Sequence, residues 1–126
     1  MNLKTLMVIK AVVTLIFGVG FVLIPMTVMS WYGLELGAGG AYMTRLFGAA
    51  FIVICLALWL GRKDAGSAAL KGLVIGVFIG DVIGFIVSLS VQIKGLVNAL
   101  GWLTVILYLL LAIGFGYYAF RKPKAA

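Results

Sequence analysis

Asp81 is the residue whose type and position best fit chemistry, because it interrupts an apolar segment, GLVIGVFIGDVIG at residues 72–84. An isolated carboxylate deep in a bilayer costs at least about 3 kcal/mol on insertion scales, so such residues usually face a bundle interior and mark a pairing or functional site. Ser88 and Gln92 fall within about 20° of Asp81 on a helical projection and would extend a polar stripe from it. Two interpretations stand: a hydrogen-bonded anchor between helices, or a site that handles an ion, a proton or a ligand.

Arg45 is the partner that we predict for this carboxylate. If the apolar segments that carry the two residues form a hairpin, Arg45 lies opposite Gly84, one helical turn from Asp81. Buried charges persist mainly when they are paired and hydrogen-bonded. We therefore expect an intramembrane ion pair between Arg45 and Asp81, with Ser88 or Gln92 completing the hydrogen bonds. In the alternative, Arg45 reaches the headgroups and a protonated Asp81 bonds to a neighbouring helix.

Four glycines spaced by four residues accompany the aspartate: Gly72, Gly76, Gly80 and Gly84. At about 100° per residue they form one ridge along a helix, which is a repeated GxxxG pattern. Small residues allow close helix contact in lipid, where the hydrophobic drive between helices is weak. The ridge is therefore predicted to pack against a helix of the same bundle or, alternatively, against another subunit or a second copy of the chain.

Other common chemistries have little support in the sequence. The chain has no histidine and a single cysteine, Cys55, so we expect no metal, no haem and no other cofactor. Ser88 and Ser90 share a segment with Asp81, but no histidine or lysine at a matching depth would activate a serine. We expect that the protein is not an enzyme.

The elements that must position these residues are membrane-spanning helices. Of 126 residues, 65% are hydrophobic and 10% are charged, which is far from the composition of a soluble domain. Long unbroken apolar runs fit helices of about 20 residues better than the alternating strands of a barrel. The sequence predicts one all-α domain over residues 1–126, an antiparallel four-helix bundle. Its predicted spans are residues 6–29, 41–60, 70–91 and 96–120.

The distribution of positive charge predicts the orientation of these spans. Eight of the ten basic residues fall on one side of the membrane if both termini share that side: Lys4, Lys10, Arg62, Lys63, Lys71, Arg121, Lys122 and Lys124. By the positive-inside rule both termini are cytoplasmic, in what we expect to be a prokaryotic inner membrane. Tyr32 then belongs to an aromatic belt at the outer boundary. Basic residues that stand singly or in pairs at the ends of apolar runs indicate topology and no nucleic-acid partner.

The segment TRLFGAAFIVICLALWLGRKD resembles the small four-span bacterial membrane proteins of unknown function. The shared features are an arginine that opens the second span, here Arg45, the small pair Gly48 and Ala49, and a basic turn. This resemblance covers most of the chain and implies a fold without an activity. The small multidrug transporters have a similar size, but they resemble the chain in size only, since their first span carries a glutamate and this one has no carboxylate.

From these features we expect a non-catalytic integral membrane protein. The first hypothesis is an accessory or structural subunit that packs against a larger membrane complex, because the chain lacks catalytic groups and soluble domains and carries the glycine ridge. Its partners would be membrane lipids and other membrane subunits. The alternative is a small transporter or a ligand- or lipid-binding bundle that uses Asp81.

Overall fold

The computed structural model describes residues 2–64 and 66–121 as a helical chain. Its helices are α1 (Leu3–Leu23), α2 (Pro25–Trp31), α3 (Ala38–Gly61), α4 (Ala68–Ile93) and α5 (Gly101–Phe120). All but the short α2 are long and apolar enough to cross a membrane. The predicted all-α fold with four spans is confirmed, and the chain is a helical membrane protein. The side that each terminus faces stays a prediction, and Lys122 and Lys124 lie outside the described residues.

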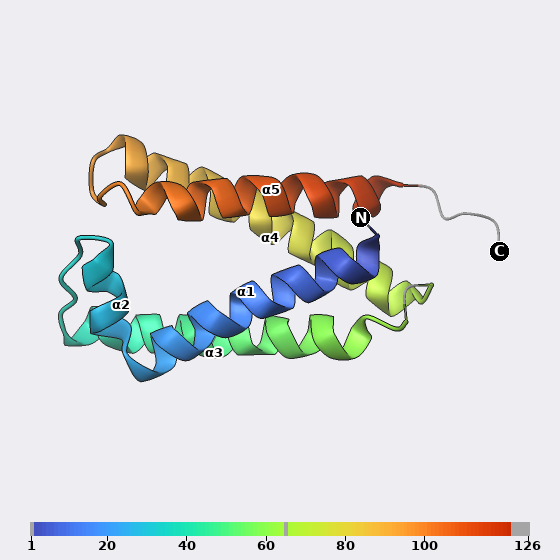
Figure 1. The fold of residues 1–126 in the computed structure, drawn as a ribbon, viewed down its shortest axis with the longest axis horizontal. Coiled ribbons are helices and arrows are strands. Elements are labelled where there is room, and N and C mark those ends of the chain that lie inside the picture. The colour runs from blue at the N-terminus through green and yellow to red at the C-terminus, as the bar shows by residue number, and fades with distance from the viewer. Residues whose placement is uncertain (1, 65, 122–126) are drawn as a thin grey trace.

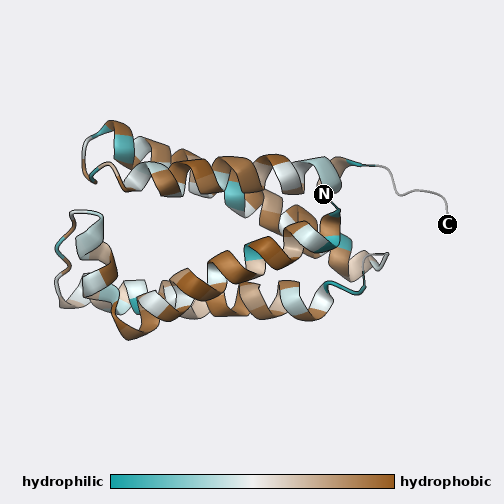
Figure 2. Ribbon diagram, in the orientation of Figure 1, coloured by the Kyte–Doolittle hydropathy of each residue, from teal (hydrophilic) through white to brown (hydrophobic). Residues whose placement is uncertain are grey.

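The long helices are arranged as two antiparallel pairs (Figure 1). α1 packs along α3, and α4 packs along α5, whereas the contacts between the pairs are far fewer. The pairs converge at the end where α1 begins and diverge toward the end that carries α2 (Figure 1). In the view of Figure 2 the long helices are mostly apolar, with hydrophilic residues at their ends and a few partway along them, as expected for helices surrounded by lipid and by one another.

The first predicted span is shorter in the structure, because the chain breaks before Pro25. α1 ends at Leu23, and Ile24 leaves the helical region with φ −136° and ψ 57°. Pro25 occupies the first turn of α2, where its missing N–H has no intrahelical acceptor to lose. The helix is therefore broken completely at Ile24, which makes α2 a separate element. The fourth span begins later than predicted, at Gly101, after a loop that includes Gly95 with φ 72°.

The closest backbone approach that the glycines permit lies where α1 crosses α3. A Cβ atom on Gly48 would lie 2.7 Å from the carbonyl oxygen of Gly18 and 2.8 Å from the Cβ of Phe21. Neither neighbour can rotate away, because one is backbone and the other is bound directly to it. The two glycines thus fix the contact between these helices.

A hydrophobic core fills the end where the two pairs converge. Met7 of α1, Leu58 of α3 and Phe115 of α5 are completely buried there. Leu70 and Val74 complete the core from α4. Because all four long helices contribute, this core holds the pairs together.

Candidate functional site

A buried ion pair links the two helix pairs. Lys10 of α1 donates from Nζ to Oδ1 of Asp81 in α4 across 2.5 Å. The exposed fractions of Lys10 and Asp81 are only 5% and 2%. Charges removed from water in this way are stable only when they are paired, so each residue depends on the other.

The predicted pairing of Asp81 with Arg45 is therefore wrong. Arg45 lies on α3 with its side chain exposed, and the carboxylate is bound by Lys10. The prediction took the spans before and after the Arg62–Ser67 turn as packed neighbours. In the structure α3 packs on α1, and α4 packs on α5, so the shared turn does not bring Arg45 to Asp81.

The sequence predicts a different role for Lys10, as one of the basic residues that orient the chain in the membrane. The structure places it about two turns into α1, on the same face as the buried residues Met7, Thr14 and Gly18. Their spacing of three and four residues was a signal that Lys10 faces the bundle interior. The pair could have been predicted by combining two features, a lysine on the buried face of one span and an aspartate inside another.

Ser88 and Gln92 do not complete the hydrogen bonds of the aspartate. Ser88 donates from Oγ to the carbonyl oxygen of Phe85 at 3.2 Å, within its own helix. Gln92 donates from Nε2 to the carbonyl oxygen of Asn98 at 3.2 Å, in the loop before α5. Ser88 and Gln92 follow Asp81 along α4, but both donate to backbone carbonyl groups near them in the sequence and neither bonds to the carboxylate.

Tyr108 and Thr14 surround the ion pair. The Lys10 ammonium lies 5.7 Å from the centroid of the Tyr108 ring, within the range of a cation–π contact. A Cβ on Gly84 would lie 2.6 Å from Cδ1 of that ring, so Gly84 provides the space that the tyrosine occupies. The Thr14 hydroxyl donates to the carbonyl oxygen of Lys10 at 2.9 Å and is thereby satisfied within α1. Of this group, only Gly84 was singled out from the sequence.

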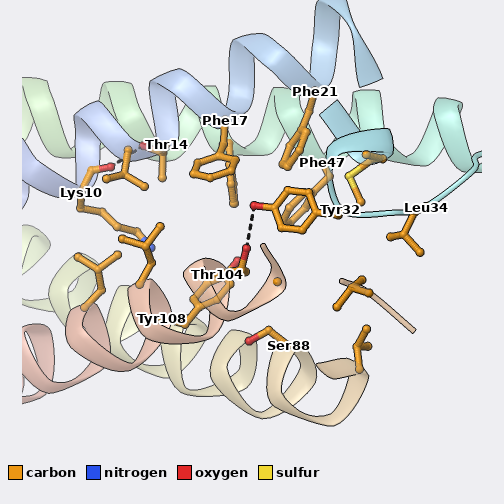
Figure 3. A pocket seen from close by; sticks show the side chains of 18 residues that line it. Lys10, Thr14, Phe17, Phe21, Tyr32, Leu34, Phe47, Ser88, Thr104 and Tyr108 are labelled. Carbon is orange, nitrogen blue, oxygen red and sulfur yellow. Dashed lines mark hydrogen bonds between the residues drawn. The ribbon is translucent and has the colours of Figure 1, made fainter. Parts of the chain in front are cut away.

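An interior pocket of about 260 Å³ begins at Lys10 and extends between the two helix pairs. Figure 3 shows Lys10 and Thr14 on one side and Tyr108 and Ser88 on the other. Much of the remaining wall is aromatic and is contributed by α1 and α3: Phe17, Phe21, Phe47 and Phe51. The pocket is thus mainly apolar, with a few polar groups placed around it.

Tyr32, just after α2, lines the interior pocket at the end opposite the core. Its hydroxyl is hydrogen-bonded to Oγ1 of Thr104 in α5 at 3.0 Å (Figure 3). The backbone N–H of Asn98 donates to the carbonyl oxygen of Tyr32 at 3.0 Å, and the Asn98 side chain donates to that of Trp31 at 3.0 Å. Tyr32 is only 8% exposed, so its predicted place in an interfacial belt does not describe its role.

A second pocket, which we call the glycine pocket, lies along α4 beside the ion pair. Its volume is about 510 Å³, and Gly72, Gly76 and Gly80 line it together with Asp81. Apart from the nearby backbone of α4, a Cβ on any of these three glycines would meet no atom of the described residues within 4 Å. The prediction that the ridge packs within the bundle is therefore wrong for all three, and of the four ridge glycines only Gly84 packs closely.

Neither pocket has the donor set of a metal site. Among residues 2–64 and 66–121, no three histidine, cysteine or acidic side chains come together. The polar groups that line the interior pocket are hydroxyls and one lysine whose charge is balanced by Asp81. This arrangement suits the binding of a neutral molecule by hydrogen bonds and apolar contact.

No protein family, curated protein or solved structure matches this chain. The resemblance to small four-span bacterial membrane proteins therefore stays a prediction.

Proposed function

We propose that this membrane protein binds a mainly apolar small molecule in its interior pocket, in a role that is not catalytic. The observation that carries the proposal is a pocket between the two helix pairs with an aromatic wall and a few convergent polar groups. Ligand sites in proteins have this composition, and bundle interiors are a common place for them. At about 260 Å³ the pocket is slightly smaller than usual ligand pockets, which begin near 300 Å³, so its ligand would be small.

The charges around the pocket favour a neutral ligand. Lys10 and Asp81 compensate each other at one end, so an ionic ligand would leave an unbalanced charge in a medium of low dielectric. At the other end the hydroxyls of Tyr32 and Thr104 already bond to each other and remain able to accept or donate one bond more. A polar substituent at one end of an apolar ligand would be oriented there.

Two adjacent valines of α1 provide a matched test. Val13 lines the interior pocket, whereas Val12 is 46% exposed on the outer side of the helix. We expect wild type and Val12→Trp, purified from membranes and released in native mass spectrometry, to carry the same small-molecule adduct. Val13→Trp fills the pocket and should lose that adduct while it keeps its thermal stability. A bare wild-type chain, or an adduct that both variants retain equally, contradicts the proposal.

A second candidate function is the accessory subunit predicted from the sequence. It is favoured by the exposed glycines of α4, which have no neighbour among the described residues and would accept a helix of another chain. Co-purification at a fixed ratio from native membranes, lost in Gly76→Leu and kept in Gly39→Leu, would support this role. A wild-type chain that migrates alone under gentle extraction would count against it.

A further inference from the structure

We propose that the glycine pocket is a second binding site, whose ligand is a slender, neutral lipophile with one hydrogen-bond donor, such as a long-chain alcohol. This goes beyond the proposed function, because it concerns a pocket that runs along α4 and another atom, although the two pockets share Lys10, Phe47, Phe51 and Tyr108. The Asp81 oxygen Oδ1 belongs to the ion pair, and the new site uses Oδ2.

The floor of the site is bare helix backbone. Gly72, Gly76 and Gly80 follow one another along α4, and no described atom lies within 4 Å of the space where their side chains would begin. Phe51 and Ile54 of α3 and Leu73 of α4 form apolar walls. An alkyl chain or another narrow apolar group gains dispersion contacts in such a groove, which a bulky side chain on α4 would prevent.

A hydrogen-bond acceptor without a donor lies beside this floor. Oδ2 of Asp81 is buried and has no hydrogen-bond partner among the described residues, while Lys10 occupies only Oδ1. A buried unsatisfied acceptor is costly, and an ionised carboxylate has room for about four hydrogen bonds. Asp81 lines the glycine pocket, but Oδ2 itself has almost no accessible surface, so a donor in this pocket satisfies Oδ2 once the Asp81 carboxylate turns slightly toward the floor.

The charge of the ion pair specifies the kind of donor. Lys10 balances Asp81, so a ligand ammonium would leave one positive charge uncompensated in the membrane interior. A ligand without any donor would leave Oδ2 unsatisfied. A hydroxyl or a neutral N–H meets both conditions, and the apolar walls require that it be attached to a lipophilic body.

Photolabelling with a matched pair of probes tests the site. The first probe is a dodecanol with a diazirine midway along its chain, and the second is its methyl ether, which has no donor. Both are added to the full chain in phosphatidylcholine nanodiscs, whose lipids have no hydrogen-bond donor to compete. We expect the alcohol to label Leu73, Val77 and Ile54 about tenfold more than the ether, as a hydrogen bond to a charged acceptor implies.

Two variants test whether the labelling depends on the glycine floor and on the Asp81 acceptor. Gly76→Leu should abolish labelling of these residues, whereas Gly39→Leu, at another glycine with open surroundings, should leave it unchanged. In the double variant Lys10→Met with Asp81→Leu, which removes both charges together, alcohol and ether should label equally. Gly76→Leu keeps the ion pair, so it remains informative even if the double variant does not fold.

Other outcomes overturn the proposal. Equal labelling by the two probes in the wild type shows that Oδ2 does not select a donor. If the probes label nothing here and Gly76→Leu instead dissociates a native oligomer or complex, a helix of another chain fills the groove. Val13→Trp, which fills the interior pocket alone, should leave the alcohol labelling intact, so the two sites succeed or fail separately.

Discussion

The glycines of α1 and α3 and the glycines of α4 differ in what lies opposite them. Gly18 and Gly48 face each other, so that a single added Cβ on Gly48 would meet backbone at 2.7 Å. Gly72, Gly76 and Gly80 have the regular spacing, yet the space above each is open to 4 Å. Regular spacing creates a groove, but a close helix contact also needs a second small residue on the partner helix.

Breaking the ion pair between Lys10 and Asp81, which borders the open glycine face, should have the largest effect on stability. Lys10→Met and Asp81→Leu should each lower the free energy of unfolding by about 3–5 kcal/mol, since each leaves one buried charge unpaired. The double variant should be clearly more stable than either single variant. Equilibrium unfolding in mixed micelles measures the free energy of unfolding of the wild type, both single variants and the double variant.

Arg45→Met is the control for this cycle. Arg45 is exposed on α3, so its removal should change the free energy of unfolding by less than about 0.5 kcal/mol. Additive losses in the Lys10 and Asp81 cycle, or a large effect of Arg45→Met, would contradict the pairing seen in the structure.

Gly48→Leu tests the closed glycine contact. The added side chain would meet the Gly18 carbonyl oxygen and the Phe21 Cβ, neither of which can move without separating α1 from α3. We expect a loss of about 3 kcal/mol, at the upper end of overpacking costs. Thermal unfolding of Gly48→Leu beside Gly39→Leu measures it, and equal stability of the two variants would show that the contact is not tight.

Gly114→Leu should have an intermediate effect. A Cβ at Gly114 would lie 2.9 Å from Cδ2 of Leu6, a side-chain end that can shift in part. A loss of about 1–2 kcal/mol follows from overpacking with partial relaxation. The same thermal unfolding measurement applies, and a Gly114→Leu variant as stable as wild type would mean that Leu6 yields freely.

Tyr32→Phe removes only the hydroxyl that bonds to Thr104. We expect a loss of about 1 kcal/mol, because one neutral hydrogen bond disappears while the buried ring stays in place. Thr104→Val should cost a similar amount, and the double variant should cost little more than either single one if the two act through this bond. A double variant whose loss equals the sum of the two single losses would contradict that contact.

Gly76→Leu should have the smallest effect on stability. With nothing within 4 Å, the new side chain gains the better helix propensity of leucine over glycine, worth up to about 1 kcal/mol, without a clash. The prediction from the sequence, that the ridge packs closely against a helix, implies instead that Gly76→Leu disrupts packing. A clear loss of stability of the isolated Gly76→Leu chain would contradict this expectation and would show that the ridge packs within the bundle.

The four spans follow from hydropathy because length and apolar content decide whether a segment crosses a bilayer. The pairing of the spans does not follow, since apolar helices in lipid have many compatible neighbours. Assuming that consecutive spans pack together gave Asp81 the wrong partner. Asp81 itself was identified correctly as a buried polar residue, because a carboxylate in a long apolar run has few other places to lie.

The remaining parts of the site depend on tertiary contacts that no local pattern specifies. Tyr108 and Thr104 are unremarkable residues of an apolar span, and they matter because α5 places them opposite Lys10 and Tyr32. The helix ends just before Pro25, and Tyr32, which follows α2, is bonded to Asn98 in the loop before α5.

The separation of α2 from α1 has a kinetic consequence for whatever enters the interior pocket. Because the helix ends at Leu23, the segment with Tyr32 moves without rotating the membrane span before it. Its release breaks a small number of hydrogen bonds to Asn98 and Thr104, whereas parting the two helix pairs would disrupt the ion pair and the shared core. Local opening of this segment therefore costs less free energy than separation of the two helix pairs, and it widens an already partly open pocket faster than global unfolding would.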